Sequence, residues 1–71
     1  AELRAAEAIR REIRRLVGGD VEVKMLSEHS AIVRADADLI PKIIGRGGRT
    51  VESLQRKLGV RIDVRERGEE S

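Results

Sequence analysis

The stretch from Ile40 to Val51 is basic and rich in glycine, and these residue types bind phosphate groups. It carries three cationic side chains and no acidic one, and three of the four positions from 45 to 48 are glycine. Glycine lets the backbone turn sharply and lets an anion approach it closely. The N–H groups and the dipole at a helix N-terminus attract anions, and arginine adds charge-assisted hydrogen bonds. The pattern therefore predicts a phosphate site with Arg46 and Arg49 beside the loop.

Two nucleotide-binding loops do not fit this stretch. A P-loop needs G-x-x-x-x-G-K-[ST] after a strand, whereas here a helix is predicted before the glycines and Arg49-Thr50 replaces the Lys-Ser/Thr pair. The dinucleotide pattern G-x-G-x-x-G is also absent, because position 50 is threonine and no strand precedes the loop. A plain turn between two helices remains an alternative explanation of the glycines alone.

The composition argues against most catalytic and metal sites. With 71 residues the chain has room for one small core and none for a buried catalytic cavity. Without cysteine there is no disulfide framework, thiolate ligand or cysteine nucleophile, and the single histidine, His29, supports neither a zinc site nor a Ser-His-Asp triad. We therefore expect no enzyme activity, no metal, no cofactor and no small-molecule substrate. Asp36 and Asp38 are interpreted as helix caps.

The charge pattern points to an anionic partner. Of the 15 cationic residues 12 are arginine, whose planar fork suits phosphate, although arginine and glutamate also pair on the surfaces of heat-adapted proteins. The chain has no aromatic residue, which excludes stacking of bases on Phe, Tyr or Trp. No apolar run is long enough to span a membrane, and no signal peptide is recognised, so no membrane partner is expected. The absence of cysteine favours an intracellular, cytoplasmic setting.

Hydrophobic periodicity predicts the elements that carry the loop. A helix is expected over 2–17, ending at two glycines, and strands over 21–25 and 31–36 are expected to form an antiparallel hairpin around a short turn at 27–30. A short helix should begin near position 37 or 38 with Asp38 as its N-cap and Pro41 in its first turn. A helix over 49–58 and a strand over 60–64 complete the pattern.

The expected fold class is α+β, in the order α-β-β-α-α-β. It places three helices on one face of a three-stranded mixed sheet. Residues 1–65 are predicted to form a single domain, and residues 66–71 a polar C-terminal tail.

The pattern of strand, short helix, Ile-Ile-Gly-Arg-Gly-Gly, helix and strand resembles a KH domain. Residues 45–48 match its GXXG loop, and the preceding helix and strand resemble the type II arrangement. More narrowly, residues 21–23, 40–45 and 59–65 resemble the C-terminal KH module of archaeal PIN-domain ATPases.

The resemblance implies that the domain binds single-stranded RNA or DNA, about four nucleotides at a time. The GXXG loop would hold the sugar-phosphate backbone, and bases would lie on aliphatic side chains, with Ile40 and Ile43 at the groove floor and Ile44 bracing the helix from beneath. Arg61 would contact base edges. The nucleic-acid-binding residues so implied are Ile40, Lys42, Ile43, Gly45, Arg46, Gly47, Gly48, Arg49 and Arg61.

A second function class remains open at this point. The domain would then keep the KH shape but act as a protein-interaction or assembly domain that docks on a host ATPase or nuclease. An intact basic GXXG loop favours nucleic acid, and the weak net charge of +2 suggests a module that works beside other domains of a larger protein. The choice between RNA and DNA, the base preference, the host protein, the oligomeric state and the affinity are not determined by the sequence.

Overall fold

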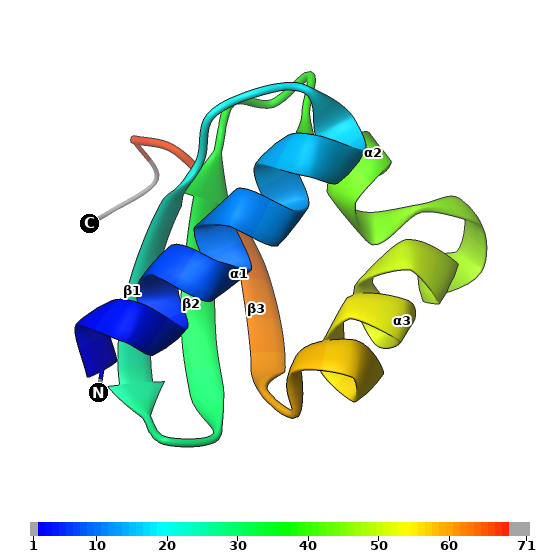
Figure 1. The fold of residues 1–71 in the computed structure, drawn as a ribbon. Helices are drawn as coiled ribbons and strands as arrows, with labels where there is room; N and C mark the ends of the chain where they lie inside the picture. The colour runs from blue at the N-terminus through cyan, green and yellow to red at the C-terminus, as the bar shows by residue number, and fades with distance from the viewer. Residues whose placement is uncertain (1, 69–71) are drawn as a thin grey trace.

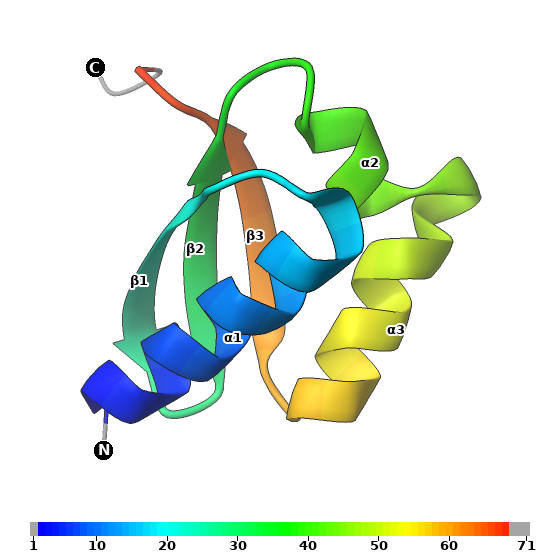
Figure 2. The same ribbon diagram turned by 45° about the horizontal axis from the view of Figure 1, so that its top comes forward.

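An amphipathic helix, α1 (Glu2–Val17), begins the fold, as the spacing of its apolar residues predicts. The computed structural model describes residues 2–68 and is shown in Figure 1. After α1 the chain forms β1 (Glu22–Ser27), β2 (Ser30–Ala35), α2 (Ile40–Ile44), the 3-10 turn η1 (Arg46–Gly48), α3 (Arg49–Leu58) and β3 (Arg61–Glu66). The helices lie on one face of the sheet, and the opposite face is open (Figure 1, Figure 2).

The sheet is mixed, as predicted, with the strand order β1-β2-β3. The hairpin pairs β1 antiparallel to β2, whereas β3 pairs parallel to β2 because the segment from α2 to α3 carries the chain back across the sheet. Val33 in the central strand is opposite Val23 on one side and Val64 on the other. The hairpin turn is tighter than predicted, since β1 continues to Ser27 and β2 already begins at Ser30.

The core lies between the helices and β2. Ile9 and Ile13 of α1 are buried against the sheet, and full burial of such a side chain contributes about 1.5–3 kcal/mol. In β2, Ala31, Val33 and Ala35 alternate with outward-facing residues and are also buried. These small side chains let the helices pack close to the central strand.

The structure differs from the sequence prediction at the start of α2. The helix begins at Ile40 rather than near 38, and Leu39 rather than Asp38 takes the N-cap position without a side-chain cap. The preceding residues form a turn instead, in which the Leu39 N–H donates to the Asp36 carbonyl over 2.9 Å. Pro41 therefore lies in the first turn, where its missing N–H needs no partner.

The last strand also ends later in the structure than predicted. β3 continues to Glu66, and the Arg67 N–H donates to the Ala35 carbonyl over 2.8 Å. The predicted tail over 66–71 therefore begins too early, because Glu66 belongs to the sheet. Positions 69–71 lie outside the described residues.

Between residues 2 and 68, none of the helices combines the length and the apolar content that a membrane span requires. Over the same range, no three His, Asp or Glu side chains lie close enough together to hold a metal ion.

Candidate nucleic-acid interface

The loop between α2 and α3 is a tight turn built on three glycines. Gly45, Gly47 and Gly48 have φ values of 76°, 62° and 80°. Other residues rarely adopt such values, and Gly45, with ψ of 174°, lies in a region that is essentially restricted to glycine. The Gly48 N–H donates to the Gly45 carbonyl over 3.1 Å and closes the turn.

Gly45 is also required by the space around it. A Cβ atom built on Gly45 would lie 2.7 Å from the Thr50 Cβ and 2.8 Å from the Thr50 backbone nitrogen, whereas Gly47 and Gly48 face open space. The loop therefore packs against the first turn of α3 at Gly45 and leaves the tip at Gly47 free. Because no side chain covers the tip, an anion has a direct approach to its backbone.

The N-terminus of α3 opens into this loop without a capping side chain. Its N-cap residue is Gly48, which makes no side-chain hydrogen bond. The first N–H groups of a helix lack partners within the helix and carry the positive end of its dipole. In α3 the Arg49 N–H already donates to the Arg46 carbonyl. Arg46 and Arg49 are exposed on either side of Gly48, and Glu52 is the acidic residue of the first turn. The two guanidinium groups outnumber this carboxylate and keep the loop basic.

β3 is an edge strand, and its outer edge pairs with no further strand among the described residues. The Arg61 N–H donates to the carbonyl of His29, just before β2, over 2.7 Å, and the Arg67 N–H donates to the carbonyl of Ala35, at the end of β2, over 2.8 Å. Since successive residues of a strand alternate in direction, Ile62 and Val64 direct their backbone groups to the open edge. The Ile62 N–H donates to Gln55 Oε1 of α3 over 2.8 Å. Beyond this bond, the edge near Val64 offers polar backbone groups of the kind that pair with base edges.

The burial of two isoleucines of α2 is the reverse of the prediction. Ile43, expected at the groove floor, is 0% exposed and belongs to the core. Ile44, expected to brace the helix from beneath, is half-buried and is not among the residues packed against the core. The core-facing positions are instead Leu39 and Ile40, together with Ile43, which follows them by four and three residues. Ile43 is therefore inaccessible to a base, whereas Ile40 and Ile44 keep part of their aliphatic surface exposed.

The other predicted site residues fall into two groups. Lys42 is exposed on α2, three residues before the first glycine of the loop. Arg61 begins β3, after the far end of α3, and a ten-residue helix is about 15 Å long. Its neighbour Ile62 points into the core, so the exposed Arg61 side chain points to the open face of the sheet. Arg61 therefore lies on the last strand, as the prediction had it, and away from the loop, and its contact with base edges stays a prediction.

Two contributions to the site were not predicted from the sequence. Thr50 packs against Gly45, and Gln55 covers the start of the β3 edge. Neither has a distinctive sequence signal, because each acts through a contact that appears only when the elements pack.

Comparisons with known proteins agree with this geometry. Residues 30–71 match the family model of the KH domain, which is more than half of the chain. The fold is similar to a crystal structure of the archaeal protein APE1850, with a TM-score of 0.69 and 25% sequence identity over 97% of this chain. The chain spans about half the length of that protein, of which 49% is covered. The search of curated proteins found no match. KH domains bind single-stranded nucleic acids. The chain belongs to the KH domain family.

Proposed function

We propose that this domain binds single-stranded RNA or DNA by holding the sugar-phosphate backbone in its GXXG loop. The observation that carries the proposal is the glycine turn that opens onto the uncapped N-terminus of α3. Arg46 and Arg49 are exposed beside it, so a phosphate near Gly47 would meet backbone N–H groups and two guanidinium groups. A GXXG loop of this family clamps about four nucleotides of backbone.

The same proposal explains how bases are held without aromatic side chains. Ile40 and Ile44 are half-buried on the short helix that leads into the loop. In the proposed groove, the free edge of β3 near Val64 would face these side chains and offer hydrogen-bonding groups. Bases would therefore rest on aliphatic carbon and present their edges to the strand backbone. The domain acts in this proposal by binding alone, without catalysis.

We further propose that the domain is of type II and works as one module of a longer protein. The element order and the parallel pairing of β2 with β3 support the type II arrangement. The similar archaeal protein is about twice as long as this chain, which supports a module within a larger protein. The C-terminal module of archaeal PIN-domain ATPases is our specific candidate for its context.

The domain is expected to bind short single strands weakly and to prefer them to duplexes, because one narrow loop makes few phosphate contacts. Fluorescence anisotropy with random-sequence RNA and DNA strands, repeated at several salt concentrations, measures this. Each phosphate contact adds about 0.7 to the log–log salt slope, so a slope of roughly −1 to −3 is expected. Tighter binding to duplex contradicts the proposal, and no binding to any nucleic acid favours the protein-docking alternative.

A further inference from the structure

A groove lies between α3 and α1. It has a volume of about 370 Å³, and α3 contributes residues from Arg49 at its N-terminus to Lys57 near its C-terminus. Arg15 and Leu16 line it from α1. Arg49 also flanks the GXXG loop, so this α1–α3 groove begins where the candidate backbone site ends. The eight-residue step from Arg49 to Lys57 spans about 12 Å along the helix.

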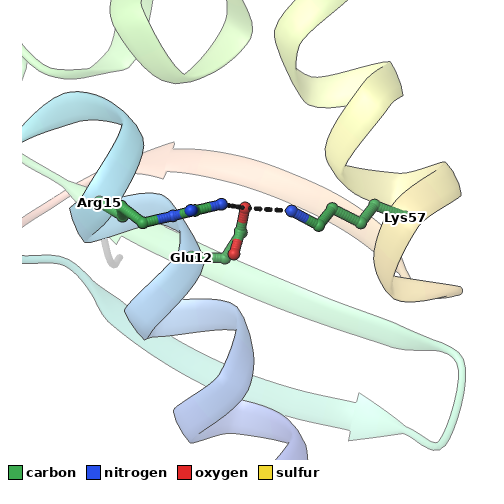
Figure 3. Close-up of polar contacts among 3 residues, drawn as sticks. All are labelled: Glu12, Arg15 and Lys57. Atoms are coloured by element: carbon green, nitrogen blue, oxygen red, sulfur yellow. Dashed lines mark hydrogen bonds and ion pairs between the residues drawn. The ribbon is translucent and has the colours of Figure 1, made fainter.

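One carboxylate holds two cations together across the groove. Glu12 Oε2 accepts hydrogen bonds from Arg15 on its own helix and from the Lys57 ammonium group on α3, each over 2.7 Å (Figure 3). The bond from Lys57, followed by that from Arg15, lowers the pKa of Glu12, so the carboxylate stays ionised. The Glu12 side chain is only 17% exposed, whereas those of Arg15 and Lys57 are 68% and 58% exposed.

The arrangement leaves a positively charged surface beside an apolar one. A lysine ammonium has three donors and a guanidinium has five, so both cations keep donors after their bonds to Glu12. With Arg49, the groove carries three cationic groups against one carboxylate. Leu16 beside them is 52% exposed, and Leu54 lies beneath the groove. Phosphate groups next to flat, apolar bases match both parts of this surface.

We propose that a strand held by the GXXG loop continues into the α1–α3 groove, where Arg15 and Lys57 bind its phosphates and Leu16 contacts a base. This inference rests on the proposed function and extends it from one loop to a longer track. Nucleic acid is favoured over an acidic protein segment because Arg49 joins the groove to the loop. An aliphatic contact at Leu16 also suits a domain that has no aromatic side chain for its bases.

The test compares a four-nucleotide and a ten-nucleotide single strand by fluorescence anisotropy. The groove variant, Arg15→Gln combined with Lys57→Gln, removes the two groove cations. The matched control is Arg14→Gln combined with Arg56→Gln, which makes the same charge change at exposed positions of the same helices. The groove variant should bind the longer strand about tenfold more weakly, as the loss of charged hydrogen bonds predicts. Its salt slope should fall by about 1.4, that is, by two phosphate contacts. Melting curves check that both variants fold.

Binding of the four-nucleotide strand should stay unchanged in the groove variant, because the loop is intact. The inference is overturned if the groove variant loses as much affinity for the short strand as for the long one, or loses none for the long one. It is also overturned if the control variant loses as much affinity as the groove variant. These outcomes leave the proposed function standing. If the groove variant loses binding to a poly-glutamate peptide while its nucleic-acid binding is unchanged, the groove is assigned to an acidic protein segment. This result also overturns the inference. Failure of the unmodified domain to bind either strand overturns both proposals.

Discussion

Arg46→Asp combined with Gly47→Asp is expected to abolish binding of single-stranded nucleic acid and to leave the fold intact. Both residues are exposed at the loop tip, and a side chain at Gly47 would meet open space. The φ of 62° at Gly47 is unfavourable for most residues. Aspartate adopts the left-handed region more readily than most, and the conformational cost there is about 1–2 kcal/mol. Two carboxylates beside the N-terminus of α3 would repel the phosphates that the loop is proposed to hold.

The matched control places the same charge change on the outer face of α1. Ala8→Asp combined with Arg11→Asp alters two exposed positions away from the loop. Binding by fluorescence anisotropy, circular dichroism and the melting temperature are measured for both variants. The control should bind with at most a few-fold loss, which reflects the lower net charge. A loop variant that keeps the native circular dichroism and still binds like the unmodified domain removes the GXXG loop from the mechanism.

Ile43→Asn is expected to unfold most of the domain. The side chain is completely buried, and its loss from the core costs about 2–5 kcal/mol by analogy with other large-to-small substitutions. An amide left without a partner in that position adds about 1–3 kcal/mol. Small domains have total stabilities at the low end of about 5–15 kcal/mol, so the sum is comparable with the whole free energy of unfolding. Chemical denaturation and thermal melting followed by circular dichroism measure the effect.

Ile44→Asn is the matched control for this prediction. Ile44 is the next residue on the same short helix, but it is half-buried and does not pack against the core. The variant should therefore remain folded and lose affinity for single strands through its altered groove surface. If Ile44→Asn proves the less stable of the two, the packing of α2 described here is wrong.

These two isoleucines also show where reasoning from the sequence stops. The long helix α1 repeats its apolar spacing over four turns, so its buried face at Ile9 and Ile13 could be predicted. Helix α2 has only five residues, so no repeat defines its buried face. Its rotation is set by the turn from Asp36 to Leu39 and by the contacts of Ile43 with the core, which are tertiary features.

The candidate site, like the fold, was predictable only where its residues are adjacent in the sequence. The glycines and arginines of the loop are adjacent in sequence, and their positions alone indicated a turn that could receive phosphate. Arg61 was assigned to the site from its place in the last strand, but the alternation of side chains turns it to the open face. The α1–α3 groove depends on a contact between Glu12 and Lys57, 45 positions apart, for which the sequence carries no local signal.

The most direct test of the central claim is to record which backbone amides respond when a short single strand binds. In a nitrogen-15-labelled sample, NMR shifts would be followed while a four-nucleotide RNA or DNA strand is added. We expect the largest changes from Gly45 to Val51 and along the open edge of β3 near Val64, the two surfaces proposed to hold the backbone and the bases. Changes confined to the open face of the sheet or to the outer face of α1, with the loop amides unmoved, would contradict it.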